Sequence, residues 1–183
     1  MRLFTNQPEA ELFLNGRSLG RKKGLSDEGC MDWITTFEPG ILSASAGELS
    51  SGQGKGCVSC SLETTGEACM LLLSDWKACG GNAGEDKKDV PPYHQVEILA
   101  ADAEGRHVAD ASLPVTIEVT GPGVLLGLEN GDLADNTPYS SPSRKTKEGR
   151  LLAYIRRTGP GVLTVTAKAE GLPASPLTLE ENR

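Results

Sequence analysis

The dipeptide Asn15-Gly16 stands between two runs in which apolar and polar residues alternate. A type I′ turn needs a positive φ at both central residues, and Asn and Gly adopt that conformation at the lowest steric cost. The dipeptide therefore predicts a β-hairpin over Glu11–Gly20. Successive side chains of a strand point to opposite faces, so we expect Leu12 and Leu14 on a buried face and Phe13 on the other.

The same alternation recurs along the chain in short runs that end at turn residues. This spacing is typical of β-sandwiches, and 38% hydrophobic residues with 22 Gly and 11 Pro agree with a turn-rich β protein. We predict two tandem immunoglobulin-like sandwiches, with a module at 1–79, a Gly-rich and charged linker at 80–92 and a C-terminal domain at 93–183. Strands expected at 56–64 and 68–76 complete the first module, and 130–150 should be a long polar loop.

Charge and hydropathy make several kinds of partner unfavourable. The net charge is −7 and is divided almost evenly between the two halves, whereas a nucleic-acid-binding protein needs a basic face. No stretch approaches the ~20 apolar residues that span a membrane. Met1 leads directly into a strand-like run that lacks the basic start and apolar core of a signal peptide. We therefore expect neither a nucleic-acid nor a membrane partner.

Five cysteines lie in the first half, and an odd number argues against a complete disulfide framework. Cys57 and Cys60 have the CxxC spacing of metal and redox sites, but a strand places residues three apart on opposite faces. The two histidines, His94 and His107, lie far from them in sequence, so we expect packed free thiols and no metal site or cofactor. Reduced thiols favour a cytoplasmic parent protein.

Longer motifs surround the hairpin and continue into the second half. The run ELFLNGRSLGRKK, with Leu3–Asn6 before it and Trp33 and Phe37–Leu42 after it, resembles an immunoglobulin-like module near the C-terminus of bacterial glycoside hydrolase family 2 enzymes, the β-galactosidase group. The second half resembles the last immunoglobulin-like domain of the same group through Asp102, Glu104-Gly105, Glu118–Gly123, Asn130–Asp132 and Gly171-Leu172. It departs from that pattern at Thr146-Lys147, where a small residue and an aromatic are expected.

The resemblance implies non-catalytic C-terminal modules that brace or shape a catalytic (β/α)₈ barrel, which would carry the two carboxylates of glycoside cleavage. This sequence shows no alternation of parallel strands and helices, so we expect the barrel to be absent and the chain to hold no catalytic, cofactor-binding or metal-binding residues. The implied partners are the barrel of the full-length enzyme and further copies of that enzyme. The alternatives are a carbohydrate-binding module and a bacterial surface adhesin repeat, which shares the strand, turn and Gly-Pro-Gly pattern.

Two kinds of residue could nevertheless contact a ligand. The group Asn130-Gly131-Asp132, with Asp135 and Asn136, could hold a cation or a sugar hydroxyl, but Asn and Asp also accept local backbone hydrogen bonds, so we interpret it as a loop anchor. Trp33 has apolar neighbours and is expected in the core, whereas Trp76 at a strand end is expected to pack against the second domain or the barrel. An aromatic content of 4% argues against a dedicated carbohydrate-binding module.

Overall fold

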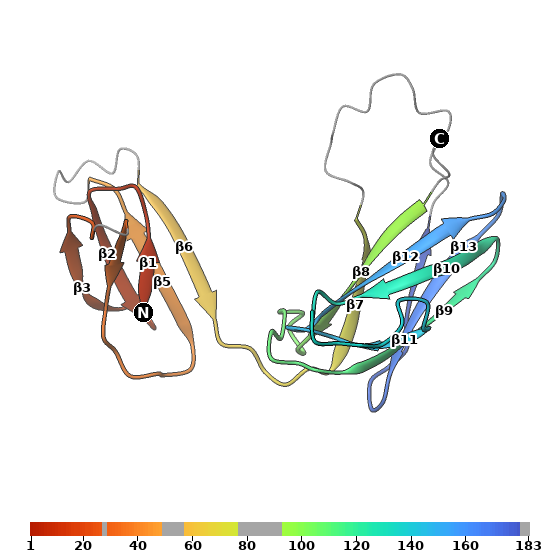
Figure 1. The fold of residues 1–183 in the computed structure, drawn as a ribbon. Coiled ribbons are helices and arrows are strands. Elements are labelled where there is room, and N and C mark those ends of the chain that lie inside the picture. Colours follow the sequence, from red (N-terminus) through yellow and green to blue (C-terminus); the bar gives the residue numbers. More distant parts are fainter. Residues whose placement is uncertain (27–28, 49–56, 77–92, 180–183) are drawn as a thin grey trace, which may run out of the picture. The chain divides into compact units, whose positions relative to one another are not determined.

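The computed structural model describes residues 1–26, 29–48, 57–76 and 93–179, and within these ranges every regular element is a β-strand (Figure 1). The predicted all-β class is confirmed. The chain divides into two compact units, Met1–Thr64 and Thr65–Arg183, called here the first and the second unit. None of the described segments forms a helix long and apolar enough to cross a membrane.

The first unit places a four-stranded antiparallel sheet, in the order β3-β2-β5-β6, beside a β1-β4 ladder. Alternate residues of β2 and β5 pack against Met31 and Trp33, and Leu12 and Leu14 are buried as the alternation predicts. The described strands of this unit are β1 (Arg2–Phe4), β2 (Glu9–Leu14), β3 (Arg17–Lys23), β4 (Cys30–Asp32), β5 (Ile41–Ala46) and β6 (Val58–Glu63).

The turn between β2 and β3 has the predicted backbone conformation, with φ of 51° at Asn15 and 77° at Gly16. The Asn15 side chain also anchors a second turn, because its Nδ2 donates to the carbonyl of Pro39 at 3.0 Å and its Oδ1 accepts the amide of Ile41 at 2.8 Å. A Cβ on Gly40 would lie 1.9 Å from Asn15 Oδ1, so only glycine fits there. One asparagine thus fixes both the hairpin and the entry into β5.

The second unit is a sandwich of two four-stranded sheets, in the orders β10-β12-β8-β7 and β11-β9-β13-β14 (Figure 1). The inward side chains of both sheets form one apolar core that includes Ile98, Val115, Leu151 and Val165. The described strands are β7 (Met70–Asp75), β8 (Tyr93–Ala101), β9 (Pro114–Thr120), β10 (Gly123–Glu129), β11 (Ser143–Lys145), β12 (Arg150–Arg157), β13 (Leu163–Ala169) and β14 (Ser175–Leu179).

The position of β7 differs from the prediction that the first module runs to residue 79. This strand pairs with β8 over six residues and buries Leu71, which is 2% exposed, in the second unit. The segment before it is held by the same unit, because the amide of Gly66 donates to Asp102 Oδ2 at 2.9 Å. The units therefore divide after Thr64, while the predicted linker at 80–92 lies outside the described residues.

Two further expectations need correction. A short strand, β11, forms inside the range expected to be a loop, because Ser143–Lys145 pairs with β9. The expectation of packed thiols holds only for Cys30, since Cys57, Cys60 and Cys69 are free and exposed, and Cys79 lies outside the described residues. Strand alternation alone does not show which face a partner element will cover.

Candidate functional site

The loop between β10 and β11 borders a hollow of about 560 Å³ in the second unit. This polar hollow is where the structure places the sequence-predicted Asn130 and Asp132. The preceding strand ends at Glu129, so the loop begins at the edge of the sandwich. The polar hollow is lined by Asp110, Ala111, Ser112, Asn130, Asp132, Asp135, Thr137, Lys145, Thr146, Lys147 and Glu148.

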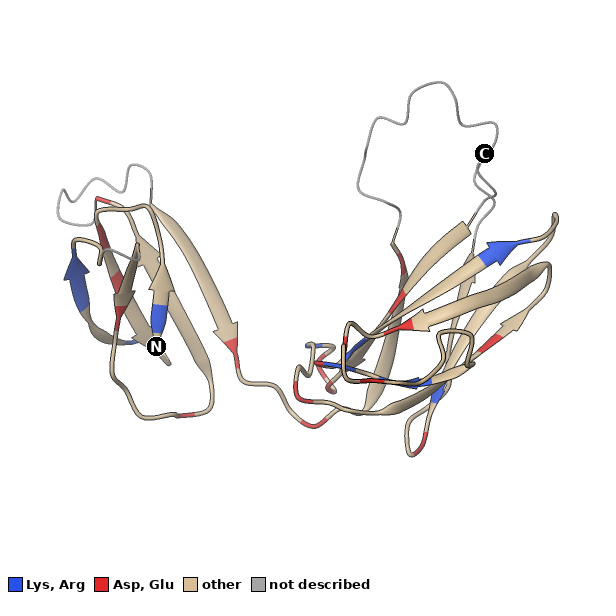
Figure 2. Cartoon of the chain, in the orientation of Figure 1, with Lys and Arg blue, Asp and Glu red and all other residues tan. Residues whose placement is uncertain are grey.

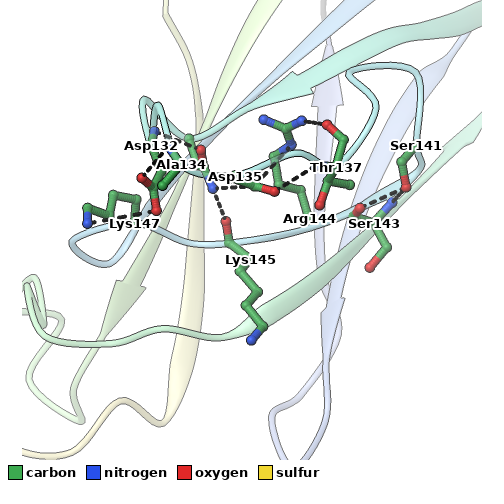
Figure 3. Close-up of polar contacts among 10 residues, drawn as sticks. Asp132, Ala134, Asp135, Thr137, Ser141, Ser143, Arg144, Lys145 and Lys147 are labelled. Carbon is green, nitrogen blue, oxygen red and sulfur yellow. Dashed lines mark hydrogen bonds and ion pairs between the residues drawn. The ribbon is translucent and has the colours of Figure 1, made fainter.

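Asn130 and Asp132 form local hydrogen bonds that shape this loop. Figure 3 labels Asp132 and its partner Ala134. The Nδ2 of Asn130 donates to Asp135 Oδ2 and to the carbonyl of Lys145, both at 2.9 Å, while its Oδ1 accepts the amide of Asp132 at 2.9 Å. The Oδ1 of Asp132 accepts the amide of Ala134 at 3.1 Å. These contacts match the loop-anchor interpretation, because amide and carboxylate oxygens here replace backbone partners.

Asp135 continues this network into the buried Arg144 (Figure 3). The Thr137 hydroxyl and backbone amide hydrogen-bond to Asp135 and lower the pKa of its carboxyl, with a smaller contribution from Arg144. Arg144 Nε lies 3.6 Å from Asp135 Oδ2, and the Arg144 side chain is only 2% exposed. Its guanidinium also donates to the carbonyl of Thr137 and lies 4.7 Å from the centre of the Tyr139 ring. Arg144 carried no signal in the sequence, because its partners depend on the path of the loop.

The turn at the end of β11 contains the departure from the family pattern. Thr146 is buried, and its Oγ1 donates to the carbonyl of Ala111 and accepts the amide of Leu113, each at 2.9 Å. Glu148 has a φ of 50°, and the following Gly149 also has a positive φ. The threonine therefore ties this turn to the segment before β9 by hydrogen bonds.

The carboxyl groups can be compared with those of a glycosidase site. Such a site needs one carboxyl with a raised pKa as the acid and a second, ionised carboxylate near it. Burial would raise the pKa of Asp102, but hydrogen bonds from Gly66 and Arg106 outweigh it and lower that pKa to about 2. All the described carboxyl groups with a clearly shifted pKa are shifted downward, namely Glu11, Asp32, Asp102 and Asp135.

The two tryptophans occupy different environments, as expected. Trp33 is 5% exposed in the core of the first unit, where its Nε1 donates to the carbonyl of Gly20 at 3.0 Å. Trp76 is 57% exposed, and its amide donates to the carbonyl of Gln95. The core prediction for Trp33 is therefore confirmed, while the partner of the Trp76 ring stays a prediction.

A second hollow, which sequence reasoning missed, lies on the outer face of the sheet β10-β12-β8-β7. It measures about 490 Å³ and contains all three tyrosines of the chain. They lie on three separate segments, so neither their spacing nor the low aromatic content indicated that they would meet. This tyrosine hollow is lined by Tyr93, Gln95, Leu126, Gly127, Leu128, Glu129, Tyr139 and Tyr154.

Acidic and basic residues are mixed in the part of each unit that the structure describes (Figure 2). Figure 2 shows acidic and basic positions interspersed along the strands and turns, with a basic run at the end of β3. In that run Arg21 pairs with Glu11 at 3.1 Å and Lys23 with Glu9 at 3.4 Å. Lys22 donates to the carbonyl of Asp32. The run is thus partnered within its own unit.

Comparisons with known proteins agree along nearly the whole chain. Residues 82–178 match the family described as "Glycoside hydrolase family 2 C-terminal domain 5", and residues 1–49 match a domain of unknown function (DUF4982). Beta-galactosidase BoGH2A of Bacteroides ovatus is 31% identical over 170 residues, which are 92% of this chain and 19% of that protein. The chain thus spans about a fifth of the length of this curated relative.

Solved structures share the fold. A glycosyl hydrolase family 2 member from Bacteroides cellulosilyticus has a TM-score of 0.83 at 24% identity, over 98% of this chain and 24% of that one. A beta-glycosidase from Bacteroides vulgatus has a TM-score of 0.80 at 24% identity, over 98% of this chain and 22% of that one. At these identities the likeness concerns the fold alone.

Proposed function

Because this chain belongs to the C-terminal region of glycoside hydrolase family 2, we propose that it supplies two non-catalytic structural modules of a β-galactosidase-like enzyme. The modules would brace the catalytic barrel or shape the rim of its site. The partners in this proposal are the barrel of the full-length enzyme and, through it, further copies of that enzyme. The β-galactosidase activity in this proposal is that of the Bacteroides ovatus relative.

The observation that carries the proposal is the state of the carboxyl groups. Each described carboxyl with a clear shift is held in its ionised form by hydrogen bonds or a cation, so it is poorly suited to donate a proton at neutral pH. The Oδ1 atoms of Asn130 and Asp132 accept hydrogen bonds from backbone amides of their own loop. These contacts support a role in holding a rigid loop at the edge of a sandwich.

A brace must keep one conformation, and two features of the second unit favour this. Its core is formed by inward residues of both sheets, and its loops are tied down by buried polar groups such as Asp102 and Thr146. A hydrogen-bonded buried polar group restricts a loop to one conformation, since leaving it unpaired is costly. The unit therefore suits a fixed spacer against a larger domain.

The Bacteroides ovatus relative allows a direct test, because the matching region is only 19% of its length. Deleting that region should lower both the melting temperature and the galactosidase kcat/KM of the relative. Grafting the present chain in its place should recover part of both, and a graft carrying a core substitution in β7 should recover less. A deletion that leaves kcat/KM and the melting temperature unchanged would rule out bracing.

A further inference from the structure

The tyrosine hollow brings three tyrosines together on one face of a sheet. On β8, His94, Val96 and Ile98 point inward, so Tyr93 and Gln95 point outward. Tyr154 on β12 pairs with Gln95, and Gly127 on β10 pairs with Tyr154, which places them in one row across three strands. The pairing of β7 with β8 places Trp76 opposite Gln95 on the same face.

The walls of the hollow are held in place before any ligand binds. Gly127 follows a β-bulge in β10, and a Cβ there would lie 3.0 Å from the carbonyl oxygen of Tyr139. The same carbonyl accepts the amide of Leu128 at 2.8 Å. Arg144, buried behind the loop, holds the Tyr139 ring through a cation–π contact at 4.7 Å. Tyr139 is therefore fixed by backbone and side chain together.

Polar groups stand at fixed positions among these rings. The Tyr154 hydroxyl donates to Glu129 Oε2 at 3.3 Å, and burial together with the Glu129 charge raises the pKa of Tyr154, so it stays a donor. The side chain of Gln95 is partly buried and lines the same hollow. Glu129 is also only partly buried, so the polar atoms of both side chains can reach a bound molecule.

We propose that the tyrosine hollow is a saccharide-binding site that contacts an uncharged pyranose, and the choice of a β-galactoside rests on the function proposed above. A pyranose has an apolar C–H face that packs on tyrosine rings, and hydroxyls at its edge that hydrogen-bond to an amide and a carboxylate. The volume of about 490 Å³ lies within the usual range for small-molecule sites, about 300–1,000 Å³. The site would add sugar contact to the structural role proposed above.

Other occupants fit the hollow less well. A packed protein surface would bury Gln95 and Glu129, which costs free energy unless each finds a partner. A nucleic acid could stack on the rings, but its phosphates would approach Glu129 on a chain with a net charge of −7. A neutral sugar covers the rings, and its hydroxyls can hydrogen-bond to the Gln95 amide and the Glu129 carboxylate as they become buried.

The test is a titration of the ¹⁵N-labelled chain with methyl β-D-galactopyranoside and with lactose, followed by amide chemical shifts. We expect saturating shifts at Tyr93, Gln95 and Tyr154. Tyr93 is 50% exposed at the start of β8, so Tyr93→Ala should keep the fold and weaken binding on the order of tenfold. Glu129→Gln keeps the shape of the side chain and removes its charge. It should weaken sugar binding, while the spectrum of the variant without sugar stays close to that of the unmodified chain.

Phe37→Ala is the matched control, because Phe37 is an exposed aromatic of the first unit and its loss should not change the affinity. The proposal is wrong if neither sugar shifts these signals, if the shifts gather at the polar hollow, or if Tyr93→Ala leaves the affinity unchanged. It is also wrong if the sugars have no effect and the same amides are shielded from solvent in the full-length enzyme, since the face is then a protein interface.

Discussion

Leu71→Ala should destabilise the second unit and leave the first unchanged. Leu71 is 2% exposed within the core of the second unit. Removing the side chain of a buried leucine costs about 2–5 kcal/mol, because the transfer free energy is lost and a cavity remains. Its neighbour Leu72 points outward and is 39% exposed, so the control Leu72→Ala should cost less than about 1 kcal/mol.

Hydrogen exchange measured by mass spectrometry can assign this loss to one unit. Leu71→Ala should speed the exchange of amides in β8 and β12, while amides in β2 and β5 keep their protection. In a Trp76→Phe background, the fluorescence of Trp33 reports the first unit, and its urea transition should not move. A shift of the Trp33 transition with unchanged exchange in β8 would refute the assignment of β7 to the second unit.

Three further substitutions test local features. Gly16→Val should lower the free energy of unfolding, measured with urea, by about 1–3 kcal/mol, because it puts a β-branched residue at positive φ. The control Gly16→Asn should cost much less, since Asn tolerates that conformation. Equal costs for the two variants would contradict an origin in the backbone conformation. Asp102→Asn should lower stability at neutral pH and flatten the acid limb of the stability profile. The pKa of Asp102 is lowered from 3.8 to about 2 in the folded protein. Its contribution to the free energy of unfolding is therefore complete above the pKa of the unfolded chain and is lost as pH falls through about 2. Acid limbs of equal slope in the two proteins would contradict this contribution. Thr146→Val should cost about 1–3 kcal/mol, because the carbonyl of Ala111 and the amide of Leu113 lose their partner, and an unchanged melting temperature would show that water replaces it.

Local features of the fold could be predicted from the sequence. The Asn15-Gly16 turn depends on two backbone angles that these residue types favour, and both angles are positive in the structure. The burial of Leu12, Leu14 and Trp33 follows from strand alternation and apolar neighbours. Each of these inferences needs information from only a few neighbouring residues.

Sheet membership could not be predicted in the same way. The residues of β7 alternate like any strand, and nothing within them shows that their hydrogen bonds go to β8 and not to β6. Proximity in sequence therefore groups this strand with β6, whereas its hydrogen bonds join it to β8. The short β11 was missed for a related reason, because its three residues gain their strand conformation from pairing with β9.

The candidate sites also have a part that the sequence predicts and a part that it does not. The role of Asn130 and Asp132 as loop anchors follows from their side-chain chemistry, but their contacts with Lys145 and Asp135 depend on how the loop returns to β11. The tyrosine hollow depends on the pairing of β8, β12 and β10, which brings Tyr93, Tyr154 and Tyr139 together. Composition counts aromatic residues and does not show where they gather.

The most direct test of the central claim, that glycoside cleavage lies outside this chain, is its activity on a chromogenic β-galactoside at high protein concentration. The account predicts no turnover above buffer, because Asp132 and Asp135 of the polar hollow are held by turn contacts and, for Asp135, by Arg144. Turnover that survives repurification and disappears in Asp132→Asn or Asp135→Asn would contradict the account and place a catalytic site in the second unit.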